Sequence, residues 1–133
     1  MKQYLTKKTM LVFGNLDVSE DSLAKIVSAK LKEELSEVDF IMCDKPDDIL
    51  SHLSKDFFIL DVVKGLNDVR LITDIDDFSQ TKTVTAHDFD LSTFLKILKE
   101  TGQIKDVKII GVPQKMGLEE AKNKIKMILE NDI

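Results

Sequence analysis

The chain has 133 residues, of which 43% are hydrophobic and 32% charged, with two Pro and five Gly. This length and composition indicate one compact globular domain spanning residues 1–133 and exclude a disordered or fibrous chain. The formal net charge of −5 argues against nucleic-acid binding, which takes its affinity from Lys and Arg side chains on phosphates.

The first apolar run, residues 9–13, ends at Gly14 and Asn15. A short, continuously apolar run predicts a strand that is buried on both faces of a sheet. It is too short for a signal-peptide core or a membrane span. We therefore expect a cytoplasmic protein that does not bind membranes, and we expect a monomer.

Apolar residues recur at helical spacing between residues 23 and 35, which predicts a helix of about four turns. Ser19 stands where it could cap this helix, and Glu20 and Asp21 fall in the expected first turn. Acidic residues at that position complement the helix dipole.

Residues 38–43 predict a second strand, and residues 46–53 predict a short helix with Pro46 in the favoured first turn. Residues 57–63 predict a third strand that carries Asp61 near its end. The apolar residues 69–73 follow after a link too short for a helical crossover, so we expect an antiparallel hairpin partner of the third strand.

The polar stretch 74–88 predicts a loop that carries His87. Residues 90–101 predict a helix that ends at Gly102, residues 107–112 the last strand, and residues 118–129 a closing helix. This alternation predicts a three-layer α/β/α fold with a mostly parallel five-stranded sheet carrying one antiparallel strand.

Three acid-base residues are the candidate site: Asp21, Asp61 and His87. In open α/β sheets, functional groups gather at the carboxyl ends of the strands, where these three would converge. An acid that follows four apolar residues costs desolvation unless a partner meets it, so Asp61 favours a site. Asp21 could instead serve the helix dipole, and His87 could be an ordinary loop residue. Two carboxylates and one imidazole could hold zinc, nickel or manganese.

Other kinds of chemistry lack their motifs. The chain has no phosphate-binding loop and no dinucleotide fingerprint, because only Gly14 lies in the first strand-helix turn. It has no nucleophile elbow, and Cys43, the one cysteine, has no histidine base beside it and cannot form an intramolecular disulfide. His52 is expected on a solvated face. A metal or proton-transfer role therefore remains for the candidate trio.

Several motifs, in this order along nearly the whole chain, resemble those of the hydrogenase maturation endopeptidases, which remove a C-terminal peptide from the large subunit of nickel-iron hydrogenases after nickel insertion. The resembling segments are Leu11-Val12-Phe13-Gly14-Asn15 followed by Ser19-Glu20-Asp21, Pro46-Asp47-Asp48-Ile49, the strand-Asp-x-x-x-Gly segment 57–65, Thr85-Ala86-His87, and Ile110-Gly111-Val112.

The resemblance implies that Asp21, Asp61 and His87 are the metal ligands and the catalytic residues of a metal-dependent endopeptidase. It implies a hydrogenase large-subunit precursor as the partner, with nickel carried by that precursor, while zinc or cadmium could occupy the site in vitro. A resident ion that polarises the carbonyl or activates water is the other role open to the metal.

The chain departs from the family pattern in the two turns near the expected site. It has Leu16 where Pro is usual, Asp17 where an apolar residue is common, Ser22 and Ala24 in place of glycines, and Cys43-Asp44-Lys45 in place of a Gly-Thr or Gly-Ser turn. These departures leave the substrate and the cleaved bond open.

Two alternatives come from other classes of protein. A phosphoacceptor receiver domain would use Asp61 as the phosphorylated residue, but it requires an acid pair directly after the first strand and a helix after Asp61. The chain has Gly14 and Asn15 in the first of these places. A non-catalytic binding module on the same fold is the second alternative, with the trio as surface and capping residues.

Overall fold

The computed structural model describes residues 8–14, 17–19, 22–80 and 86–131, and it describes the backbone alone for residues 79–80 and 86–90. The elements in chain order are β1 (Lys8–Val12), α1 (Leu23–Glu34), β2 (Val38–Met42), the 3-10 helix η3 (Pro46–His52), β3 (Phe57–Val62), β4 (Arg70–Ile72), α2 (Ile75–Gln80), α3 (Ala86–Glu100), β5 (Ile109–Val112) and α4 (Leu118–Asn131).

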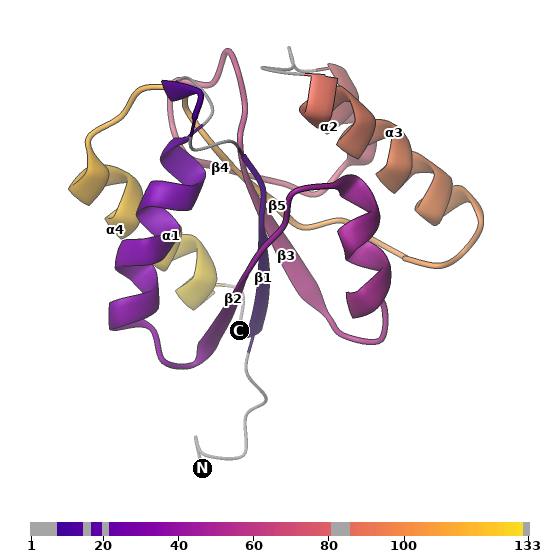
Figure 1. Ribbon diagram of the computed structural model, residues 1–133, viewed down its shortest axis with the longest axis horizontal. Helices are drawn as coiled ribbons and strands as arrows, with labels where there is room; N and C mark the ends of the chain where they lie inside the picture. Colours follow the sequence, from indigo (N-terminus) through magenta and orange to yellow (C-terminus); the bar gives the residue numbers. More distant parts are fainter. Residues whose placement is uncertain (1–7, 15–16, 20–21, 81–85, 132–133) are drawn as a thin grey trace.

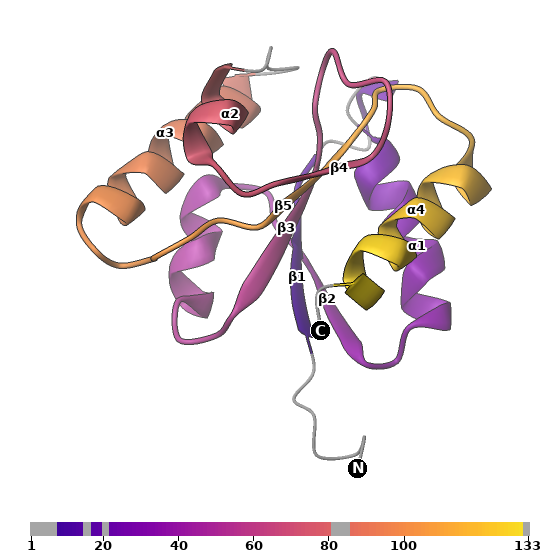
Figure 2. The same cartoon turned by 180° about the vertical axis from the view of Figure 1, so that it is seen from behind.

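The five strands form one sheet in the order β2-β1-β3-β5-β4. All neighbouring pairs are parallel except β4 and β5, which are antiparallel. Helices α1 and α4 cover one face, and η3, α2 and α3 cover the other (Figures 1 and 2). The predicted three-layer α/β/α fold with one antiparallel strand is therefore confirmed.

The prediction that residues 69–73 form a hairpin with the third strand is wrong. Strand β5 lies between β3 and β4 and pairs with both, so Gly111 faces Asp61 on one side and Arg70 on the other. The segment between β3 and β4 therefore crosses the carboxyl end of β5. Proximity in sequence suggested direct pairing, but a strand that arrives later in the chain inserts between the two.

The predicted starts of two helices, α1 and α3, are also wrong. Helix α1 begins at Leu23, with no acidic residue in its first turn, so Ser19 is not its cap and Asp21 precedes it. The hydroxyl of Ser22, the residue before the helix, donates to the Ser19 carbonyl oxygen at 3.1 Å. The side chain of Ser22, the residue at the N-cap position, therefore bonds back to the preceding turn and not to the first amides of α1.

The stretch 74–88 is not a loop throughout. It contains α2, whose Ile75 and Phe78 are 6% and 4% exposed, and the next helix, α3, already begins at Ala86. The two apolar residues, one turn apart, bury the inner face of α2 although the surrounding sequence is polar. His87 consequently lies in the first turn of a helix rather than in the loop before it.

The core consists of two clusters, one on each face of the sheet. Alternation along β3 sends Leu60 to the cluster under α1 and α4, and Ile59 to the cluster under the other helices. The predicted stop of α3 is confirmed: Gly102 has φ +79°, and its N–H donates to the Lys99 carbonyl oxygen at 3.1 Å.

No helix in the described part of the chain combines the length and the apolar character needed to cross a membrane.

Candidate functional site

Asp61 lies in β3, the middle strand of the sheet, one residue before its end. Its side chain is fully buried, at 0% exposure, which confirms the burial that its apolar neighbours predicted. The backbone N–H of Val62 donates to Asp61 Oδ1 at 2.9 Å. A carboxylate that is fixed by a backbone amide inside a sheet has a defined orientation, which suits a ligand or an acid-base group.

Strand alternation places Asp61 on the same face as Ile59 and Val63, which belong to the cluster under η3, α2 and α3. Its neighbour across the sheet is Gly111 of β5. A Cβ atom at Gly111 would lie 2.8 Å from Leu66 Cδ1 and 3.1 Å from Val63 Cγ2. Glycine at this position therefore lets the segment between β3 and β4 pack closely over the sheet beside Asp61.

The other two candidate residues are not placed beside Asp61 by side-chain geometry. Asp21 lies outside the described residues, and only the backbone of His87 is described. The backbone is compatible with convergence: α1 follows β1, and α3 begins at the carboxyl end of the sheet (Figure 1). Convergence of the trio remains a prediction. Among side chains that the structure describes, no group of three His, Cys, Asp or Glu could hold a metal.

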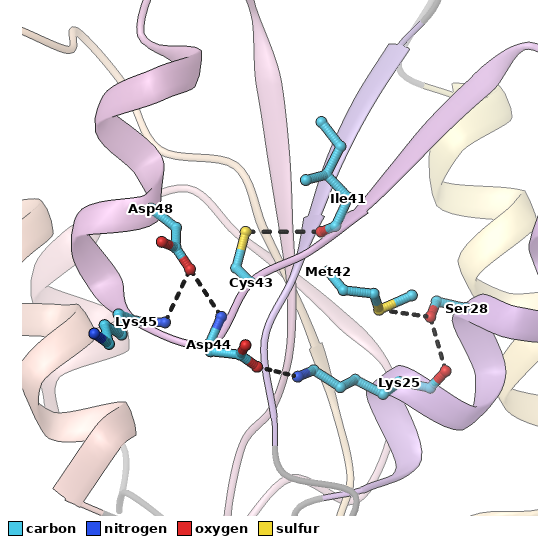
Figure 3. A network of polar contacts seen from close by, with 8 residues as sticks. All are labelled: Lys25, Ser28, Ile41, Met42, Cys43, Asp44, Lys45 and Asp48. Carbon is cyan, nitrogen blue, oxygen red and sulfur yellow. Dashed lines mark hydrogen bonds and ion pairs between the residues drawn. The ribbon is translucent and has the colours of Figure 1, made fainter.

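Cys43, at the carboxyl end of β2, is 1% exposed, and its thiol lies 3.7 Å from the carbonyl oxygen of Ile41 (Figure 3). Burial, reinforced by the negative charge of Asp48, raises the pKa of the Cys43 thiol from 9.0 to about 11. The thiol is therefore protonated at neutral pH, when it is neither a nucleophile nor a metal ligand. This agrees with the absence of a cysteine-protease motif.

The turn after β2 is held by charged side chains (Figure 3). Lys25 of α1 donates to Asp44 Oδ1 at 3.1 Å, which ties this helix to the turn. The backbone amides of Asp44 and Lys45 donate to Asp48 Oδ2 at 2.9 and 3.1 Å. These two bonds hold the pKa of the Asp48 carboxyl below its ordinary value. The turn that departs from the family pattern is therefore fixed by ion pairing and capping.

Sequence reasoning treated Asp44 and Lys45 only as departures and gave Lys25 no role. The ion pair joins residues 19 positions apart, and nothing in the helical periodicity marks Lys25. One signal was available in the sequence. Lys25 lies near the start of α1, and the strand before this helix, β1, ends at the same edge of the sheet as the turn that contains Asp44.

No family model matches the chain, and no curated protein matches it. Solved structures do. The hydrogenase maturating endopeptidase HybD from E. coli superposes with a TM-score of 0.69 and 15% identity, over 94% of this chain and 93% of that one. The fold is that of the hydrogenase maturation endopeptidases.

Two further structures of this kind are similar to the chain. The endopeptidase HycI from Escherichia coli gives a TM-score of 0.65 at 20% identity, over 95% of this chain and 90% of that one. The hydrogenase 3 maturation protease gives a TM-score of 0.64 at 20% identity, over 92% of this chain and 88% of that one. Since nearly the whole of each chain is covered, the likeness extends to the full three-layer architecture.

Proposed function

We propose that this protein is an endopeptidase that removes the C-terminal extension of a nickel-iron hydrogenase large-subunit precursor after nickel insertion. The observation that supports this most is Asp61: a fully buried carboxylate in the middle strand, within a fold shared with HybD and HycI. A buried acid in an otherwise apolar strand costs stability, so its presence favours a role in recognition or chemistry.

In this proposal Asp21, Asp61 and His87 bind the metal ion. The ion is the nickel that the precursor already carries, so it arrives with the substrate. One imidazole and two carboxylates form a mixed nitrogen and oxygen donor set that suits nickel and also accepts zinc or cadmium in vitro. Asp61 is oriented before substrate binding by the Val62 amide. Binding of the ion would hold the scissile segment at the sheet edge, where water hydrolyses the peptide bond.

The receiver alternative is not favoured. A receiver needs a helix after the strand that carries the phosphorylated aspartate, whereas here residues 63–69 lead without a helix into the antiparallel strand β4. The non-catalytic alternative is compatible with the fold but does not explain why a carboxylate, that of Asp61, is buried in the sheet. We further propose that the protein acts in the cytoplasm and as a monomer.

Co-expression with each candidate large-subunit precursor tests the proposal. We expect one precursor to lose a short C-terminal peptide in nickel-supplied cells and to remain full length in nickel-depleted cells. Processing that proceeds equally without nickel would contradict metal recognition, and the absence of processing for every precursor would contradict the peptidase assignment.

A further inference from the structure

Strand β2 is an edge of the sheet. In the order β2-β1-β3-β5-β4 it has β1 on one side and, within the described part of the chain, no strand on the other. At five residues it is longer than β4, the strand at the opposite edge, which has three. An edge strand presents a row of backbone donors and acceptors that an extended peptide can pair with.

The hydrogen bonds to β1 define which groups of β2 face outward. Lys8 N–H donates to the Glu37 carbonyl oxygen at 3.0 Å, and Cys43 N–H donates to the Val12 carbonyl oxygen at 2.8 Å. In a parallel pair, every second residue bonds to the same neighbour, so the odd-numbered residues of β2 bond to β1. The amides and carbonyls of Phe40 and Met42 therefore point toward the open side.

The open edge strand itself carries a large exposed apolar side chain. Met42, on the strand itself, is 47% exposed, and its sulfur lies 3.9 Å from the hydroxyl of Ser28 on α1 (Figure 3). On the 3-10 helix η3, which follows β2 in the chain, Leu50 is 49% exposed.

The exposed charges of the segment that contains β2, residues 37–48, are mostly acidic. Glu37, Asp39 and Asp47 are exposed, Lys45 is the one exposed cation in this segment, and Asp44 is paired with Lys25 of α1. An acidic rim favours a peptide that carries Lys or Arg side chains. The strand also ends at the same edge of the sheet as Asp61, because Met42 is level with Val12, and Val12 with Leu60, in the register.

We infer that the open edge of β2 binds an extended, basic segment of the precursor as a sixth strand, an inference that rests on the proposed function. Such a strand would lie three strand spacings, about 14 Å, from β3. About four or five extended residues span that distance. The segment recognised at the edge would therefore be separated from the cleaved bond by roughly this number of residues, which would cross the carboxyl end of β1.

The test is hydrogen-deuterium exchange of the full chain with and without a nickel-loaded precursor. The outward amides of Phe40 and Met42 should exchange at least about tenfold more slowly in the complex, since each gains a hydrogen bond. Fragments that cover β4, the other edge, should be unchanged. A complex in which residues 38–43 gain no protection overturns the inference. Concentration-dependent protection without precursor would indicate a second copy of the chain and also overturn it.

A matched pair of variants gives a second readout. Met42→Pro removes one outward N–H but leaves the bonds to β1, which come from its neighbours, so the edge strand should persist. Met42→Ala keeps that N–H and shortens the side chain. We expect kcat/KM for precursor cleavage to fall about tenfold more in the proline variant than in the alanine variant. Equal cleavage by the two variants would overturn the edge-strand inference but leave the peptidase function intact. If the unmodified protein cleaves no precursor, both the inference and the peptidase function are contradicted.

Discussion

The two faces of strand β3 differ in kind. On one face Phe58, Leu60 and Val62 belong to the hydrophobic cluster under α1 and α4. On the other face lie Ile59 of the strand and Val63 just after it, with a fully buried acid, Asp61, between them. The two helices over the first face are also joined by ion pairs: Glu34 of α1 binds Lys122 and Lys126 of α4.

This contrast separates stability from chemistry within one strand. The α1 and α4 face contains what a packed layer requires, apolar burial with charges paired at its surface. The opposite face carries a buried carboxylate, a glycine beside it in β5, and a protonated thiol. Substitutions on the first face should therefore change the free energy of unfolding, and the substitution of Asp61 on the second should change activity.

The largest effect is expected from Asp61→Asn. The amide keeps the shape of the side chain but removes the charge, so cleavage of a nickel-loaded precursor should fall more than about a hundredfold. The free energy of unfolding should change by less than about 1.5 kcal/mol, because the volume and one acceptor oxygen remain. Asp106→Asn, at an exposed loop position, is the matched control and should cleave normally. Full activity of Asp61→Asn would show that Asp61 has no role in the active site.

Leu60→Ala makes the opposite test one residue away. Leu60 is 0% exposed in the α1 and α4 cluster, so its truncation should lower the free energy of unfolding by about 3 kcal/mol in urea titration. Leu50→Ala, at a position that is 49% exposed, should cost less than about 1 kcal/mol. A comparable loss of stability in both variants would contradict the conclusion that the buried apolar residues carry more of the stability than the exposed ones.

The thiol of Cys43 should be unreactive in the native protein. A pKa of about 11 in place of 9.0 leaves a thiolate fraction about a hundredfold lower at pH 8. Alkylation by iodoacetamide should therefore be at least that much slower than in the urea-unfolded chain. Because the folded pKa is raised, Cys43 contributes stability below its unfolded pKa, and this contribution is lost as the pH rises through about 11. Rapid native alkylation would contradict this burial.

Gly111→Ala tests the close approach beside Asp61. The added methyl group would meet Leu66 Cδ1 at 2.8 Å and Val63 Cγ2 at 3.1 Å, so these side chains must shift, at a cost of about 1 to 2 kcal/mol. Gly117→Ala, where nothing lies within 4 Å of the added atom, should change the free energy of unfolding by less than about 1 kcal/mol. A neutral Gly111→Ala would show that the segment between β3 and β4 packs more loosely.

The smallest effect is expected from Asp48→Asn, which weakens two backbone bonds in the turn after β2. Because the carboxyl is largely solvated, the loss should be below about 1 kcal/mol at neutral pH. The pKa of Asp48 is lowered in the folded protein, so its contribution is present above the unfolded pKa and disappears as the pH falls through the folded pKa. Urea titrations from pH 7 to pH 3 should show the two proteins converging; a constant difference would contradict this origin.

Much of the fold could be predicted because its signals are local. The apolar residues 9–13 predicted a buried strand, and β1 covers Lys8–Val12 with strands on both sides. Gly102 predicted the end of α3 because a left-handed residue suits a helix stop. The single antiparallel strand followed from the short link after β3.

The pairing partner of β4 could not be predicted, because strand order depends on contacts between segments distant in sequence. Only the register of Gly111 with both Asp61 and Arg70 shows that β5 separates β3 from β4. Helix α2 was missed for a different reason: Ile75 and Phe78 are too few apolar residues to establish a helical period in a polar stretch.

The candidate site divides in the same way. The burial of Asp61 could be predicted, because four apolar residues precede it in the same strand. The ion pair between Lys25 and Asp44 could not, because it joins two elements 19 residues apart. The convergence of Asp21 and His87 on Asp61 stays a prediction that depends on side chains outside those described.

The most direct measurement of the central claim is the intact mass of a purified nickel-loaded precursor before and after incubation with this protein. We predict a loss of mass that equals one short C-terminal peptide, and no loss when the precursor lacks nickel. A precursor that is shown to carry nickel, to be cleavable by its own maturation peptidase, and to keep its full mass with this protein would contradict the account.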